Sequence, residues 1–176
     1  MRRLMTGSLL YLLPLLLLLV LLVACGTMSP PAPAQEDQIR EAVFRYQFQH
    51  NRSGISIPAS AYCLTLGEYR IPYDVTNDPS DEFIRRFEGH VPAVKKGSEC
   101  YFERRRGQLY TGVIDRETGE PALVFRVESV KWVNNQAVVV EGGYNSNLLS
   151  ASGNVYELTR EEGKWVVEKV TPRWIA

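Results

Sequence analysis

The feature that most constrains this chain is its first 25 residues, which differ in character from everything that follows. Arg2 and Arg3 precede an almost unbroken apolar run over residues 9–23, and this run ends at Cys25. About 15 apolar residues are short for a hydrocarbon core of about 30 Å, and Pro14 interrupts them, so a transmembrane helix is disfavoured. A positive start, an apolar middle and a small-residue end are typical of a cleaved export signal, so residues 1–24 are excluded from the fold prediction.

The apolar run closes on the residues LVACG at positions 22–26, which resemble the lipobox of bacterial lipoproteins. The resemblance implies that the Cys25 thiol receives a diacylglycerol group, that the chain is cut before Cys25, and that the new amino group is acylated, typically with palmitate. Two or three acyl chains give stable anchoring where one chain is marginal. By the same resemblance, Gly26 implies the outer membrane of a Gram-negative cell, or otherwise the outer face of the plasma membrane. An ordinary secretory signal is the alternative.

Composition divides the chain into three regions. Residues 1–24 are the signal peptide, and residues 25–37 are the lipidated cysteine and a proline-rich tether that favours extended polyproline II. Residues 38–176 have the length of one ordinary domain.

The charge balance excludes one class of partner. The chain has 20 basic and 20 acidic residues, and loss of Arg2 and Arg3 with the signal leaves 18 basic against 20 acidic. A nucleic-acid-binding domain usually has a basic surplus, which is missing here. The expected partners are therefore the membrane, through the lipid, and an envelope protein or a small apolar ligand, with no nucleic acid.

The two remaining cysteines, Cys63 and Cys100, form an even pair in a compartment that permits disulfides. The alternative is two buried thiols that act as small apolar groups, because Cys63 lies in an apolar run. Neither CxxC nor paired-histidine spacing occurs, so no metal site is expected.

The first half of the domain predicts two helices and a strand. Asp37 is a suitable N-cap for a first helix, whose apolar residues recur with helical spacing on two faces and which ends near residues 51–54. A helix with two apolar faces is usually packed between two layers. A strand is expected over residues 59–68. Asp78 as N-cap, Pro79 at the first helical position and Gly89 as the stop predict a second, short helix.

The second half reads as antiparallel strands. Strands are expected near residues 98–103 and 109–114, and a hairpin turn at 115–119 leads to an alternating strand from residue 123. The alternation slips at Ser129, which predicts a β-bulge. A turn at 134–136, a strand over 137–144 and a hairpin of 152–160 with 164–170 follow. This order predicts an α+β domain.

The C-terminal residues resemble a known fold family. GxxYxL at 153–158, GKWxV at 163–167 and the closing Trp174-Ile175 resemble small bacterial lipoproteins with a nuclear-transport-factor-2-like (NTF2-like, cystatin-like) cone. The resemblance implies two N-terminal helices against a strongly bent antiparallel sheet, with a pocket between the long helix and the sheet. We expect Trp165 to be a core residue near Val43 or Tyr46 on the first helix.

Enzymes built on such cones, including ketosteroid isomerase and scytalone dehydratase, place Asp, Tyr or His in the pocket. The possible pocket residues here are Tyr46, Glu128, Glu141 and Tyr144. For each, a solvent-facing strand residue or a packed tyrosine is the simpler interpretation. No GxSxG, phosphate-binding loop or HExxH motif occurs, so no catalytic residue and no cofactor are assigned. The sequence therefore favours a membrane-anchored, non-enzymatic accessory or binding module. The alternatives are a small cofactor-free isomerase, dehydratase or hydrolase, and a structural surface protein.

Overall fold

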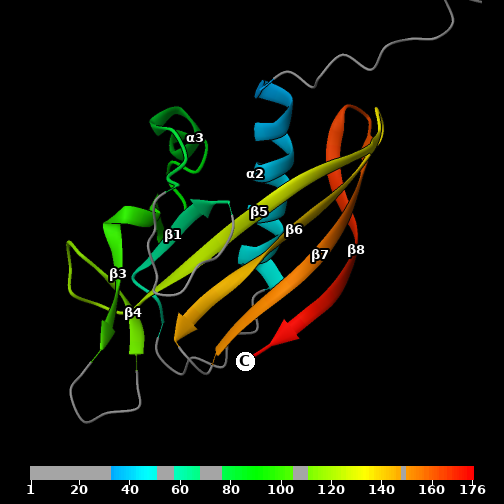
Figure 1. Cartoon of the computed structure of the whole chain (residues 1–176). Helices are drawn as coiled ribbons and strands as arrows, with labels where there is room; N and C mark the ends of the chain where they lie inside the picture. The colour runs from blue at the N-terminus through cyan, green and yellow to red at the C-terminus, as the bar shows by residue number, and fades with distance from the viewer. Residues whose placement is uncertain (1–32, 51–57, 68–76, 105–110, 148–149) are drawn as a thin grey trace, which may run out of the picture. The chain divides into compact units, whose positions relative to one another are not determined.

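The computed structural model describes residues 33–50, 58–67, 77–104, 111–147 and 150–176, which belong to one compact unit. Strands hold 57% of these residues and helices 22%. Along the chain (Figure 1) the elements are α2 (Pro33–His50), β1 (Ala61–Leu66), α3 (Asp81–Arg85), β2 (Ala93–Lys96), the 3-10 turn η1 (Gly97–Glu99), β3 (Cys100–Arg104), β4 (Thr111–Asp115), β5 (Ala122–Asn134), β6 (Ala137–Asn147), β7 (Ser150–Glu161) and β8 (Lys164–Ile175).

All eight strands belong to one mixed sheet. Strands β5 to β8 form an antiparallel meander, and β3 pairs antiparallel with β4. Strand β1, however, runs parallel to both β2 and β5. The predicted antiparallel sheet of an NTF2-like cone is therefore wrong, because the chain before β5 crosses over to form a parallel edge rather than continuing as hairpins.

The prediction of two N-terminal helices is also wrong, because α2 is the one long helix in the described chain and α3 has five residues. The expected N-cap, Asp78, instead accepts hydrogen bonds from the Ser98 amide (2.9 Å) and hydroxyl (2.5 Å). Ser80 caps α3, since its Oγ accepts from the Phe83 amide at 3.1 Å. Because α3 starts later than predicted, it has room for one turn before the helix must end at Gly89, whose φ is 79°.

Helix α2 begins at Pro33, four residues before its predicted cap, Asp37. Proline is tolerated in a first helical turn because the amides there have no helical acceptor. Asp37 lies inside the helix and pairs with Arg40 at 3.2 Å. Residues 33–37, predicted as the end of the tether, therefore belong to α2.

One face of the sheet packs against α2, which lies across the meander in Figure 1. The apolar side chains of this inner core come from α2, α3 and alternate positions of the strands: Ile39, Val43, Phe44, Leu64, Phe83, Phe87, Leu123, Phe125, Val127, Val138, Val140, Tyr156, Leu158 and Trp165. Trp165 is 7% exposed and meets Trp132 edge-on at 5.5 Å. Its predicted place in the core is confirmed.

Strand residues that alternate with the inner ones form a smaller, outer core. It contains Ala61, Cys63, Cys100, Val113, Ala122 and Val124. A disulfide joins Cys63 of β1 to Cys100 of β3, with 6.3 Å between their Cα atoms. The bridge links the β3–β4 pair covalently to β1, which lies between β2 and β5 in the sheet.

The predicted irregularity in β5 is confirmed. Val127 pairs with Gly142 and Ser129 with Glu141, so Glu128 is one extra residue in the β5–β6 ladder. After Glu128, alternate residues of β5 face the inner core again, because Val130 and Trp132 pack against it. The turn after Asn134 and the β7–β8 turn also lie where they were predicted.

Candidate functional site

The four residues predicted to line a pocket do not lie together. Tyr46 of α2 and Tyr144 of β6 pack against the inner core. Glu141 follows the inward-facing Val140 and therefore points to the opposite, outer face. Glu128 joins Glu141 in an ion network there, so the pair of acids and the pair of tyrosines are separated by the sheet.

The two inner tyrosines have ordinary packing roles. The Tyr46 ring stacks on His50 at 3.9 Å and meets Tyr156 edge-on at 6.0 Å. The Tyr144 ring lies 6.5 Å from that of Phe125. Neither tyrosine has a hydrogen bond to a carboxylate among the described residues, so no acid–base pair forms at this place.

A buried polar cluster that the sequence did not reveal lies beside these tyrosines. Gln47 of α2 is 5% exposed, and its Nε2 donates to the Tyr156 hydroxyl (3.1 Å) and to the Arg126 carbonyl (3.2 Å). Asn154 also donates to the Tyr156 hydroxyl, at 3.3 Å. Burial raises the pKa of Tyr156 despite these two hydrogen bonds, so its hydroxyl stays protonated at neutral pH. The cluster fixes α2 on the sheet.

The outer face carries a row of four residues in register across four strands. Arg126 pairs with Gly143, Gly143 with Gly153, and Gly153 with Trp174. Cβ atoms on the two glycines would collide with the Arg126 guanidinium and the Trp174 indole, so both side chains lie directly on the glycine backbone. The guanidinium carbon is 5.1 Å from the centre of the Trp174 ring. A glycine inside a strand often marks such a close approach.

The donors of Arg126 are directed at neighbouring acceptors. Its Nε donates to Glu128 at 2.7 Å, Nη2 to the Ser152 carbonyl at 2.8 Å, and Nη1 to Asn145. Arg126 is completely buried, and a buried charge is tolerated when it is paired and hydrogen-bonded. This arrangement joins four strands and explains the arginine by structure, not by ligand binding.

Glu128 and Glu141 are linked through one cation, Arg173 of β8. Arg173 Nη1 lies 3.1 Å from an oxygen of each carboxylate, and Lys131 lies 2.9 Å from Glu141. The hydrogen bond from Lys131 lowers the pKa of Glu141, burial opposes this shift, and Arg173 adds to the lowering. Glu141 is therefore ionised at neutral pH and unsuited to act as a general acid. Glu128 is engaged by two cations, Arg126 at 2.7 Å and Arg173 at 3.1 Å.

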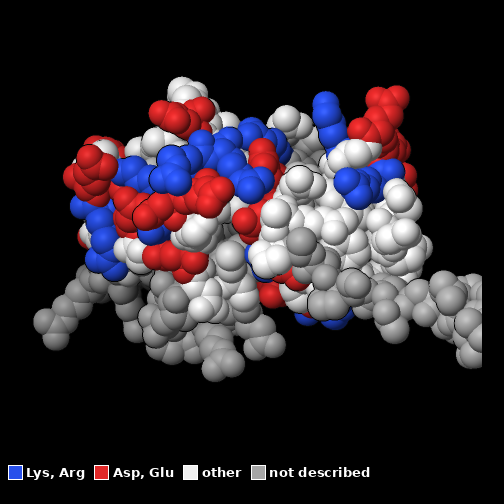
Figure 2. All heavy atoms as spheres, turned by 90° about the horizontal axis from the view of Figure 1, so that it is seen from above, with Lys and Arg blue, Asp and Glu red and all other residues white. Residues whose placement is uncertain are grey.

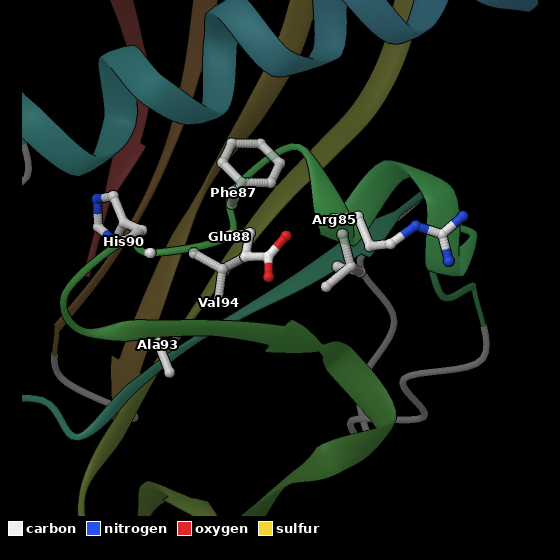
Figure 3. Close-up of a pocket in the computed structure, with 8 residues that line it drawn as sticks. Arg85, Phe87, Glu88, His90, Ala93 and Val94 are labelled. Carbon is white, nitrogen blue, oxygen red and sulfur yellow. The ribbon is translucent and has the colours of Figure 1, made fainter.

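A pocket of about 360 Å³ lies between α3 and β2. Figure 3 shows Glu88 between His90 and Arg85, with the Arg85 guanidinium pointing away from it. The eight residues that line the pocket combine apolar walls with three ionisable groups: Ile84, Arg85, Phe87, Glu88, Gly89, His90, Ala93 and Val94. His90 Nδ1 is 2.8 Å from the Pro92 carbonyl, and the centre of the His90 ring lies 4.9 Å from that of Phe48. None of the four predicted pocket residues lines it.

The α3 segment is held against α2 by aromatic rings and by charges of both signs. Phe44 of α2 meets Phe83 and Phe87 edge-on. Arg86 lies 3.3 Å from Glu41, which also pairs with Arg45 at 2.8 Å. Figure 2 shows basic and acidic side chains interspersed over this face of the molecule. These contacts therefore fix the α3 side of the pocket relative to α2.

The described residues contain no group of three or more His, Cys, Asp or Glu side chains that could hold a metal ion. Cys25, the predicted lipidation site, lies outside the described residues.

No protein-family model, no curated protein and no solved structure matches the chain.

Proposed function

We propose that this chain is a lipid-anchored protein of the bacterial cell envelope that binds another envelope protein and carries out no reaction. The anchor is Cys25, and the membrane is the outer membrane of a Gram-negative cell or the outer face of the plasma membrane otherwise. The observation that carries the binding role is the pocket between α3 and β2, which has apolar walls and ionisable groups among its lining residues. Binding sites commonly combine such walls with a few polar groups that fix orientation.

The disulfide supports a compartment outside the cytoplasm. Disulfides persist in oxidising compartments and are rare in the cytosol. The chain has three cysteines, and the Cys63–Cys100 bridge leaves Cys25 as the remaining one. In the described residues, every helix is too short or too polar to cross a bilayer.

The pocket chemistry favours binding over catalysis. A nucleophile or general base needs a partner within hydrogen-bond reach that activates or orients it. Arg85 and Glu88 form no hydrogen bond or ion pair through their side chains with other described residues, and His90 Nδ1 lies beside the Pro92 carbonyl. We therefore assign the three groups to recognition.

The pocket is tested by site-specific photocrosslinking of the full-length protein in native membranes. Ala93 lines the pocket and is exposed, so replacement by p-benzoylphenylalanine should leave the fold intact and give a light-dependent adduct with a protein. Ala34 at the start of α2 is the matched control, since it is exposed and remote in sequence. Equal adduct formation at both positions, or none at Ala93, would contradict the binding role.

The anchor is tested independently by labelling cells with a palmitate analogue. Cys25→Ser should lose the label, because only the cysteine sulfur accepts the diacylglycerol group. A Cys25→Ser protein that labels as well as wild type would overturn the anchoring proposal and leave the pocket result unaffected.

A further inference from the structure

We infer that the partner of the pocket is a second copy of this chain, which binds about a twofold axis through the α3–β2 surface, defined as the pocket-lining residues together with Val91. The inference rests on the proposed binding role of the pocket and names its occupant. A twofold interface must be complementary to itself, because residue i of one copy meets residue j of the other and the reverse. The α3–β2 surface meets this requirement in shape and in charge.

The shape of the surface includes both a projection and a hollow. Val91 is 89% exposed, more than any other large apolar residue among those described. It follows His90 and precedes Ala93 by two positions, and both of these residues line the pocket of about 360 Å³. A valine side chain fits readily in such a volume. In a twofold pair, each Val91 can enter the pocket of the other copy, which removes the most exposed valine from water.

The charges on the surface are also self-complementary. Arg85 and Glu88 lie three residues apart on the α3 side of the pocket and both are exposed. Arg85 contributes to the lowered pKa of Asp81, after the larger effects of the hydrogen bond and charge of Lys96, but it does not bond to Asp81. A twofold pair allows Arg85 to meet Glu88 of the partner subunit, and the same contact forms a second time by symmetry. Opposite charges across an interface fix orientation and exclude wrong partners.

Anchoring makes a small contact of this kind effective. Two copies held on one membrane meet at a raised effective concentration, so a surface too small for a stable dimer in solution can still be occupied. The pair is therefore expected in membranes and weak in dilute detergent.

The test uses full-length protein in native membranes, with two epitope tags on co-expressed copies and p-benzoylphenylalanine at Val91. Illumination should give an adduct of twice the chain mass that carries both tags. Val133 is the matched control, because it is also an exposed valine (62%) but lies at the end of β5. We expect a yield at Val133 at least about tenfold lower.

Charge reversal then separates this pairing from other contacts. Arg85→Glu and Glu88→Arg should each reduce the two-tag adduct about tenfold, because each places like charges together twice, and the double variant should restore it. Reversal of the exposed pair Lys169 and Glu157 serves as the control and should change nothing. An adduct of another mass at both Ala93 and Val91 would overturn the second copy as partner while leaving the proposed binding role standing. The absence of any adduct at Ala93 would contradict the proposed binding role, and its absence at Val91 would overturn the second copy as partner. Failure of the double variant to recover would overturn the charge pairing.

Discussion

The two faces of the sheet are stabilised by different means. On the inner face, fourteen buried apolar or aromatic residues from α2, the α3 segment and the strands pack together, and the dominant force is the removal of apolar surface from water. The outer face has a core of six small or medium side chains, together with a disulfide and the buried Arg126 between glycine backbone and Trp174. A core of that size contributes little burial, so specific bonds take a larger share there. Substitutions on the two faces should therefore destabilise the protein by different mechanisms.

The largest loss is expected on the inner face, from Trp165→Ala. Truncation of a buried tryptophan removes its packing against Trp132 and leaves a cavity, which costs about 3–5 kcal/mol of unfolding free energy. Urea denaturation of the full chain measures it. The neighbouring Val166 is 39% exposed, so Val166→Ala is the control and should cost under about 1 kcal/mol. Equal losses of unfolding free energy for the two variants would show that Trp165 is not a core residue.

On the outer face, the double variant Cys63→Ser, Cys100→Ser should cost about 3–4 kcal/mol. The bridge closes a loop with a sequence separation of 37 residues, and its removal enlarges the unfolded ensemble. The same denaturation experiment on wild-type protein, with and without reductant, should give the same difference. A loss under about 1 kcal/mol would show that the outer core is stable without the bridge.

Gly143→Ala tests the stacked row on the outer face. The added Cβ would overlap the Ser152 carbonyl and lie 2.8 Å from Arg126 Nη2, and neither group can move without opening the β6–β7 ladder or displacing the guanidinium. We expect a loss of about 2–3 kcal/mol, as for other overpacked sites. Gly119→Ala is the contrasting variant, because a Cβ there meets no atom within 4 Å and the cost comes from its φ of 72° alone. A larger loss at Gly119 would contradict the close approach.

Asp115 makes the stability of the outer core depend on pH in the acid range. Burial by itself would raise its pKa, but hydrogen bonds from Lys95, the Glu117 amide and Thr118 together lower it. A carboxyl whose folded pKa is depressed contributes stability above its unfolded value of about 3.9 and loses it as pH falls through the folded pKa. Stability should thus be insensitive to this group near neutral pH and should decline below about pH 4.

Asp115→Asn should cost about 1–2 kcal/mol at pH 7 and should flatten that acid decline. Lys95 keeps Glu117 as a partner at 2.5 Å, which limits the loss. Denaturation of both proteins across pH 3–7 tests this, and an unchanged acid decline in the variant would assign it to other carboxyls.

The smallest effect is expected from Glu157→Gln, which breaks an exposed pair between β7 and β8. Glu157 and Lys169 are 47% and 64% exposed, and such pairs contribute under about 1 kcal/mol. Added salt should reduce the difference from wild type. A loss comparable to that of Gly143→Ala would show that surface charge, and not the stacked row, holds this edge of the sheet.

The same division explains how far the sequence predicts the structure. The inner face was predictable because its signal is local: helical spacing marked α2, alternation marked the strands, and the slip at Ser129 marked the bulge. The parallel pairing of β1 was not, since it joins residues 61–66 to residues 93–96 and 122–127 and leaves no trace in the period of either segment.

The outer row was missed for a related reason. Arg126 alternates with Phe125 and Val127 and so reads as a solvent-facing residue, while its cover, Trp174, lies 48 positions later. The available signal was the pair of strand glycines, Gly143 and Gly153, because a glycine inside a strand indicates that something approaches the backbone. The prediction of the four pocket residues rests on residue type and fold resemblance, and neither determines which face of a sheet a side chain occupies.

The bulge at Glu128 has a consequence for how this chain can vary in length. Val127 and Val130 both point inward, and Glu128 is the one residue between them without a partner opposite. Deletion of Glu128 would therefore leave every core residue of β5 on its present face, whereas deletion of a residue in a regularly paired stretch away from a bulge would turn the part of the strand beyond it over. A shortened β5 without Glu128 should fold with a straighter sheet and with Arg126 deprived of its carboxylate. In distant relatives of this chain, the position after Val127 is where a one-residue gap inside a strand should be found.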